Sequence, residues 1–237
     1  MDEVKFQEEL NDRINKYDLL QHSFYKAWSM GYLTKLDLLD YAQNYYHHVA
    51  AYPQCLDNLL SRVPAGSTRE IIEQNKSDEE GAGYSDGRPH GELWLDFVEG
   101  MGGRRDFAQK HKPLAEFKSL ISDFDGSTRN DSVVEALSIL YAYESQVPRL
   151  AAEKSARLKE EYDADDKACI YFDTHVEEDT EHSRTLLEEL TRNVTGSAER
   201  CKAALDAAER GAKWLWQALD GIERIRQQNL LVPAGAD

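Results

Sequence analysis

The chain of 237 residues contains little cysteine and no long apolar run. Its three cysteines, Cys55, Cys169 and Cys201, are odd in number and widely spaced, so they predict neither a disulfide framework nor a thiolate metal site. No stretch of about 18 apolar residues is present, which argues against a transmembrane helix. The start, Met1-Asp-Glu-Val, is acidic where a signal peptide is basic. We therefore expect a cytoplasmic protein with no membrane partner.

Basic residues are also scarce, because 28 lysines and arginines stand against 44 acidic residues, for a net charge of −16. An excess of negative charge disfavours nucleic acids and anionic membrane surfaces as partners. The remaining composition, 41% hydrophobic and 30% charged, is that of a globular protein long enough to bury a sizeable core.

No segment alternates apolar and polar residues for long enough to predict a strand, whereas the helical period recurs along the chain. We therefore expect one all-α domain. The predicted helices cover residues 2–16, 18–30, 34–51, 54–62, 67–79, 91–101, 112–124, 130–159, 164–192 and 197–228. Thr34 and Asp37 form the predicted N-cap and capping-box pair of the third helix. Pro53 and Pro64 are expected to bracket a short helix.

The most informative motif places His175, Asp179 and His182 at positions i, i+4 and i+7. At roughly 100° per residue, these side chains point to the same side of a helix. Imidazole nitrogen and carboxylate oxygen suit iron, manganese or zinc, so one helix can contribute several ligands to a buried site. Taken alone, this stripe is weak support for a metal, because acids and histidines also line solvated helix faces by chance.

Three further candidates lie upstream. Glu144 has alanine, tyrosine and leucine neighbours that predict burial, and a buried carboxylate needs a cation, a hydrogen-bond network or a metal. Glu79 and His90 flank the glycine-rich segment 81–91, the clearest predicted loop, and could close onto one metal ion. In isolation they are an ordinary helix-end acid and an ordinary loop histidine. The candidate metal ligands are therefore Glu79, His90, Glu144, His175, Asp179 and His182. Six ligands from separate segments suffice for two metal ions in a helix bundle, with open positions for oxygen.

Six stretches within residues 20–185 carry a family resemblance. They are His22-Ser-Phe-Tyr25-Lys-Ala-Trp28, Asp40-Tyr-Ala-Gln-Asn-Tyr-Tyr46-His-His48, Asn75 to Glu80, His90-Gly-Glu-Leu-Trp94, Tyr143-Glu-Ser-Gln-Val-Pro148 and Tyr171-Phe-Asp-Thr-His175 to His182. In this combination the chain resembles the family of the chlamydial death-domain-associating protein, among the haem-oxygenase-like dimetal oxygenases related in fold to pyrroloquinoline-quinone synthase and thiaminase-like enzymes. The resemblance implies a single haem-oxygenase-like helical domain over residues 1–237. It also implies that the six candidate ligands hold two metal ions, Fe/Fe or Fe/Mn, which use O2 and an external reductant. A homodimer is expected by fold analogy alone.

The resemblance further implies an activity, the formation of para-aminobenzoate for folate synthesis from a tyrosine side chain of the enzyme itself. A lysine is the implied amine donor, and the matching residues here are Tyr25 and Lys154. A tyrosine ring is already para-substituted, so oxidative cleavage at Cβ would leave a carboxylate and exchange of the phenol oxygen would supply the amine. Tyr41, Tyr141 and Tyr143 are rival tyrosines. Without the resemblance, we would interpret Lys154 as solvated and Tyr25 as core.

Two other function classes stay open. A dimetal oxygenase could act on an external small molecule, such as an amino acid or a fatty acid. The chain could instead be a non-enzymatic interaction protein, because the name of the chlamydial family records binding to death domains. His47 and His48 differ by about 100° around a helix, so at most one can line a cavity. We interpret His22 and His111 as structural or surface residues.

These assignments predict a specific geometry. Glu144 should converge with the stripe on the 164–192 helix in one buried pocket, with Glu79 and His90 at its mouth. Tyr25 and Lys154 should both approach that pocket, because the ring must reach the activated oxygen and the amine must reach the ring.

Overall fold

The computed structural model describes residues 2–85 and 87–231, and these residues form helices and no strand. The predicted all-α class is confirmed. In chain order the helices are α1 (Glu3–Asn15), η1 (Leu19–Gln21), α2 (Ser23–Ser29), α3 (Lys35–Leu60), α4 (Ser67–Glu79), α5 (His90–Gly100), α6 (Arg105–Lys110), α7 (Ala115–Asn130), α8 (Val133–Glu144), α9 (Val147–Tyr162), α10 (Asp166–Val194) and α11 (Ala198–Leu231). None of the helices in the described ranges combines the length and apolar character that crossing a membrane requires.

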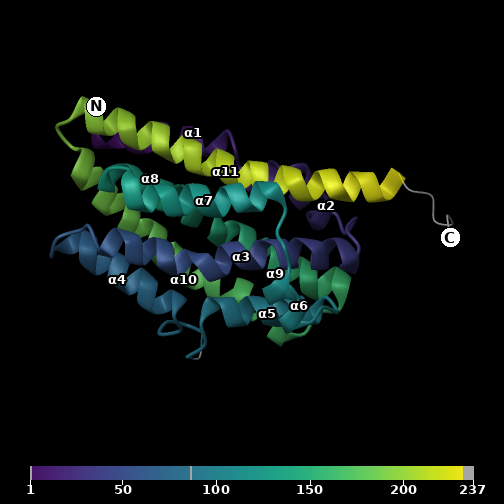
Figure 1. Cartoon of the computed structure of the whole chain (residues 1–237). Helices are drawn as coiled ribbons and strands as arrows, with labels where there is room; N and C mark the ends of the chain where they lie inside the picture. Colours follow the sequence, from purple (N-terminus) through teal and green to yellow (C-terminus); the bar gives the residue numbers. More distant parts are fainter. Residues whose placement is uncertain (1, 86, 232–237) are drawn as a thin grey trace.

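The helices form a bundle. Helix α10 contacts each of the other helices that carry candidate metal ligands. Figure 1 shows the long α11 along one side of the molecule, with α8 and α7 against it and α3 beyond them. On the opposite side, α4 and α5 pack against α3. Helix α10 contacts α4, α5, α8 and α9. The segments that carry Glu79, His90 and Glu144 therefore all meet the helix that carries the histidine stripe.

Helix α10 buries one continuous face that combines apolar and ligating side chains. It starts at the N-cap Asp165, whose side chain accepts a hydrogen bond from the backbone N–H of Ala168. The buried residues at spacings of three and four are Phe172, His175, Asp179, His182 and Leu186. This stripe is apolar at both ends, at Phe172 and Leu186, and polar in between. When the apolar ends pack into the core, the polar side chains between them are buried as well.

A buried glutamate fixes α4 against α10. Gly66, the N-cap of α4, has no side chain to satisfy the first backbone N–H groups. Glu189 of α10 instead accepts hydrogen bonds from Ser67 Oγ, at 3.1 Å, and from the Thr68 hydroxyl. The contact ties the N-terminal end of α4 to α10, and Glu79 lies at the other end of α4.

The predicted helix break at Pro53 is wrong, because α3 runs unbroken from Lys35 to Leu60 with Pro53 inside it. An interior proline costs about 3 kcal/mol relative to alanine. The buried residues Tyr52, Leu56 and Leu59 around the proline compensate, since each large apolar side chain contributes about 1.5–3 kcal/mol on burial. The capping box of Thr34 and Asp37 at the start of this helix is confirmed.

The single helix predicted over 130–159 is also wrong, because α8 ends at Glu144 and α9 begins at Val147. Pro148 lies in the first turn of α9, where its missing N–H has no intrahelical partner to lose. The break places Glu144 at the C-terminal end of α8. Three smaller differences are the separate η1 and α2 in place of one helix over 18–30, the unpredicted α6, and a later start for α7.

Candidate metal centre

The six predicted ligands form two groups of three buried side chains. In each group, one potential ligand atom per residue lies within 4.8 Å of the others. The first group is Glu79, His90 and His175, and the second is Glu144, Asp179 and His182. The division differs from the expected one, because His175 joins Glu79 and His90. These two residues are also as buried as the rest, at 6% and 1% exposure, and do not form a mouth.

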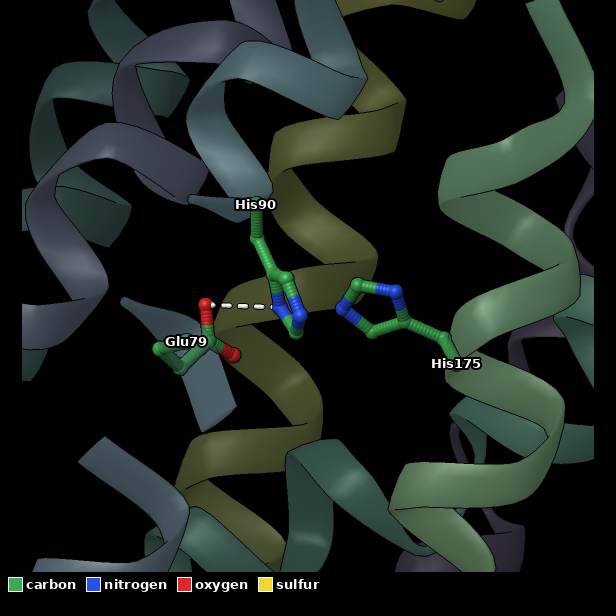
Figure 2. A group of neighbouring side chains, drawn as sticks. All are labelled: Glu79, His90 and His175. Atoms are coloured by element: carbon green, nitrogen blue, oxygen red, sulfur yellow. Dashed lines mark ion pairs between the residues drawn. The ribbon is translucent and has the colours of Figure 1, made fainter. Parts of the chain in front are cut away.

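The first group joins α4, α5 and α10. Figure 2 shows the Glu79 carboxylate and the His175 ring turned toward the ring of His90. Glu79 Oε2 lies 3.0 Å from His90 Nδ1, and the two imidazole centroids are 4.4 Å apart. His175 Nδ1 lies 2.7 Å from the carbonyl oxygen of Tyr171. When Nδ1–H donates to this oxygen, the lone pair of Nε2 remains available to a metal.

Charge in the first group is strongly perturbed. Burial, and then the neighbouring His90, hold the pKa of His175 well below its usual value, so His175 is neutral, as a metal ligand must be. Burial also disfavours the charged form of His90, but the carboxylates of Glu79 and Glu178 outweigh burial and raise its pKa to about 10. The group therefore favours positive charge at the place where its side chains meet.

The second group combines Glu144 at the end of α8 with two residues of α10. Glu144 Oε1 accepts hydrogen bonds from Asn75 Nδ2, at 2.7 Å, and from the Tyr52 hydroxyl. His182 Nδ1 lies 3.4 Å from Asp179 Oδ1. Burial raises the pKa of Asp179 to about 7. In His182, the nearby carboxylates outweigh burial and raise the pKa to about 10.

Both groups contain buried polar atoms that lack a hydrogen-bond partner within the described part of the chain, and a bound metal ion would satisfy them. Among the described residues, Glu144 Oε2, His182 Nδ1 and both ring nitrogens of His90 are buried without an aligned hydrogen-bond partner. An unsatisfied buried polar group costs about 1–3 kcal/mol. These four atoms belong to the two groups and are of the oxygen and nitrogen types that iron and manganese bind, although described residues elsewhere, such as Trp28 and Tyr162, also have buried polar atoms without a partner. The donor set therefore fits two metal ions.

Sequence reasoning missed two acids that touch the same histidines. Asp78 Oδ2 lies 2.9 Å from His182 Nε2, and Glu178 Oε2 lies 3.0 Å from His90 Nε2. Each is the sequence neighbour of a predicted ligand, and neighbouring helix positions point about 100° apart, which hid them. The spacing of Glu178, three residues after His175 on the same helix, is the signal that could have found it.

Tyr25 and Lys154 meet in the core between α2 and α9. Lys154 Nζ lies 4.9 Å from the centroid of the Tyr25 ring and donates hydrogen bonds to the Tyr25 carbonyl oxygen, at 3.1 Å, and to Ser29 Oγ, at 3.0 Å. The Tyr25 and Tyr41 hydroxyls are 2.7 Å apart and hydrogen-bonded. Lys154 is completely buried, and burial lowers its pKa to about 8.

A narrow cavity of about 20 Å³ lies beside Tyr25. Its tyrosines are Tyr25, Tyr41, Tyr45, Tyr143 and Tyr171. The Tyr171 ring lies 4.0 Å from that of His175, so one aromatic layer separates the cavity from the first group. Of the three rival tyrosines, Tyr41 and Tyr143 line this cavity.

The other residues singled out from the sequence lie outside the two groups. The Tyr141 hydroxyl donates to Asn11 instead of facing the cavity. His48 is buried against the ring of Tyr45, whereas His47 is partly exposed. His22 is buried and caps α2 by accepting from the N–H of Phe24. His111 is partly exposed beside α6.

Known proteins with a similar sequence indicate the family of this chain. The family model described as "iron-containing redox enzyme", of the haem-oxygenase-like type, matches residues 39–216. The chain belongs to this family. It is 35% identical to the 4-aminobenzoate synthase of Chlamydia trachomatis, over 76% of this chain and 77% of that protein. It is 30% identical to the 4-aminobenzoate synthase of Nitrosomonas europaea, over 95% and 94% of the two chains.

Solved structures place the fold of this iron-containing redox enzyme among haem-oxygenase-like proteins. A TenA homologue from Pseudomonas syringae superposes with a TM-score of 0.80 at 14% identity, covering 92% of this chain and 93% of that one. A domain with a haem-oxygenase-like fold from Shewanella denitrificans gives 0.77 at 18% identity, covering 99% and 97%. At these identities the likeness concerns the fold, and the predicted haem-oxygenase-like architecture is confirmed.

Proposed function

We propose that this iron-containing redox enzyme makes 4-aminobenzoate (para-aminobenzoate), with the Tyr25 side chain as the source of the ring and Lys154 as the amine donor. The observation that carries the proposal is the buried contact of Lys154 Nζ with Tyr25, beside an aromatic cavity whose wall includes Tyr171, the neighbour of His175. The names of the 4-aminobenzoate synthases from Chlamydia and Nitrosomonas support the product.

Glu79, His90 and His175 would hold one metal ion, and the group around Glu144 would hold the second. Two such ions, Fe/Fe or Fe/Mn, would supply the activation of O2 that carbon–carbon cleavage requires, with electrons from an external reductant. The other steps depend on the protein's own side chains.

Lys154 is suited to act as a nucleophile because a pKa of about 8 leaves roughly a tenth of its amine neutral at pH 7. A solvated lysine would be almost entirely protonated. The hydrogen bonds to Tyr25 O and Ser29 Oγ hold the amine over the ring. Lys154 and Tyr25 are both buried, so the amine meets the ring away from bulk solvent.

The position of the Tyr25 ring is fixed by one hydrogen bond and by aromatic packing. The hydroxyl is fixed by Tyr41, and the ring packs against Phe24 and Trp28. The cavity beside it has room for about one water molecule, so it cannot admit an amino acid or a fatty acid. At Tyr25 itself, this space suits a ring supplied by the protein and leaves no room for an external substrate.

Isotope labelling tests the proposal. Protein produced with ring-labelled tyrosine is purified, loaded with iron and manganese, and given reductant and O2. We expect labelled 4-aminobenzoate and a matching loss of mass from the protein. Label that reaches the product only from added free tyrosine would show an external substrate and refute the self-consuming reaction.

Two variants sharpen this test. Tyr25→Phe removes the phenol oxygen and should make no product. Tyr141→Phe removes a buried hydroxyl outside the cavity and should keep product formation, so it is the matched control. If both variants lost product formation equally, the loss would be due to damaged packing and the role of Tyr25 would be refuted.

A further inference from the structure

A second, larger pocket adjoins the two ligand groups, and Tyr25 does not line it. Its volume is about 630 Å³, and it lies between α4, the 81–85 loop and α10. Three acids on its rim, Glu70, Glu177 and Glu181, are exposed. Its inner wall contains the buried residues Asp78, Glu178 and His182. The pocket therefore connects solvent to the two acids that contact the candidate ligands.

We infer that this pocket captures divalent metal ions from solvent and passes them to the two ligand groups. The inference rests on the proposed metal centre. Five of the lining residues are acidic, and none of the lining residues is lysine or arginine. A concave surface lined by charge of one sign concentrates counter-ions and raises their association rate.

The inner wall of the pocket contains a buried carboxylate that contacts a candidate ligand. Glu178 is 3% exposed, and its Oε2 is buried without an aligned hydrogen-bond partner among the described residues. The same oxygen lies 3.0 Å from His90 Nε2 in the first group, and Asp78 Oδ2 lies 2.9 Å from His182 Nε2 in the second. One buried carboxylate therefore leads from the pocket to each ligand group.

The 81–85 loop is held in place by Glu178. The backbone N–H of Tyr84 donates to Glu178 Oε1 at 2.6 Å. A Cβ added at Gly83 would collide with the same oxygen, so a larger residue there requires the loop or the Glu178 carboxylate to shift. The loop therefore covers Glu178, with the Tyr84 N–H on Oε1 while Oε2 faces His90.

The charge of the lining also indicates what the pocket does not bind. A carboxylate-bearing substrate, such as an amino acid or a fatty acid, would meet five acids, and the cationic groups beside them, His90, His182 and Arg184, already pair with Glu178, Asp78 and Glu181. A divalent ion gains from the same field. A cation is therefore the ligand class that the lining selects.

The rate of metal uptake tests the inference. Full-length protein stripped with a chelator is mixed with Mn²⁺ at low ionic strength. After fixed times it is desalted, and the bound manganese is measured. The pocket variant is Glu70→Gln with Glu177→Gln, which removes two exposed rim charges and no candidate ligand. We expect uptake to be about three- to tenfold slower, at or below the lower end of the rate effects of focused charge, because only two of the charges are removed. The final amount bound should be unchanged.

The control variant is Glu8→Gln with Asp12→Asn, two exposed acids of α1 that change the net charge equally. Its uptake should match the wild type, and the difference between the variants should shrink at 1 M salt, where the screening length is about 3 Å. Equal uptake by the two double variants would overturn the inference and leave the metal centre standing. No retained manganese in wild-type protein would instead overturn the centre and the inference together.

Gly83→Ala provides an independent variant that leaves every charge in place. The displaced loop should uncover Glu178, and release of bound manganese to an added chelator should be several times faster than from the wild type. An unchanged release rate would show that the loop does not cover the route.

Discussion

Replacing Lys154 by methionine should stabilise the protein near neutral pH while abolishing 4-aminobenzoate formation. Burial lowers the pKa of Lys154 from 10.5 to about 8. One pKa unit corresponds to about 1.4 kcal/mol, so keeping the ammonium form in the folded protein costs about 3 kcal/mol. Methionine removes this cost but also loses hydrogen bonds to Tyr25 O and Ser29 Oγ, worth about 1 kcal/mol each. We expect a net gain of about 1 kcal/mol at pH 7.

The sign of the effect should reverse at alkaline pH. Between pH 8 and 10.5 the unfolded chain binds the lysine proton and the folded chain does not, so Lys154 makes wild-type stability rise with pH. The cost of the buried charge is fully present below pH 8 and disappears as the pH approaches 10.5. With two hydrogen bonds as its only remaining contribution, Lys154 should make the wild type more stable than the variant above about pH 9.

Urea unfolding of both proteins from pH 7 to pH 10 measures this difference. Other groups titrate equally in the two proteins, so only the difference in unfolding free energy is compared. The control is Lys118→Met, because Lys118 is exposed on α7. Its difference from the wild type should stay constant with pH. A Lys154→Met difference that is equally constant would refute the lowered pKa and with it the neutral amine.

Three further predictions follow from particular contacts. Glu144→Gln should retain the helical circular dichroism of the wild type but bind about one metal ion fewer per chain by metal analysis; an unchanged metal content would contradict the second group. Tyr25→Phe should keep the wild-type metal content and lose about 1 kcal/mol in urea unfolding, because the hydrogen bond to Tyr41 is lost; a loss of metal would instead make Tyr25 part of the centre. Pro53→Ala should raise the unfolding free energy by about 1–3 kcal/mol, because alanine restores the missing N–H inside α3; destabilisation would show that the ring is needed for packing.

Proline shows why the helix boundaries were only partly predictable. Sequence reasoning placed a break at Pro53 and none at Pro148, and the structure has the reverse. The local cost of proline depends on whether its N–H would have had a partner, which differs between a helix interior and a first turn. At Pro53 the buried neighbours outweigh that cost, and their burial is decided by helices far away in the sequence.

The sequence by itself determined the helical class and the shared direction of His175, Asp179 and His182. These features depend on the 3.6-residue period, which is local. The tertiary structure decided which side chains share a group. Four residues rise about 6 Å along α10, so His175 reaches α4 and α5 while Asp179 and His182 meet Glu144.

Packing between distant segments also brought Lys154 onto Tyr25, and Asp78 and Glu178 onto the histidines. Lys154 looked solvated because its sequence neighbours are charged, yet α2 covers it completely. A period along one helix gives the direction of a side chain. Only the packing of helices that are far apart in the chain determines what that side chain meets.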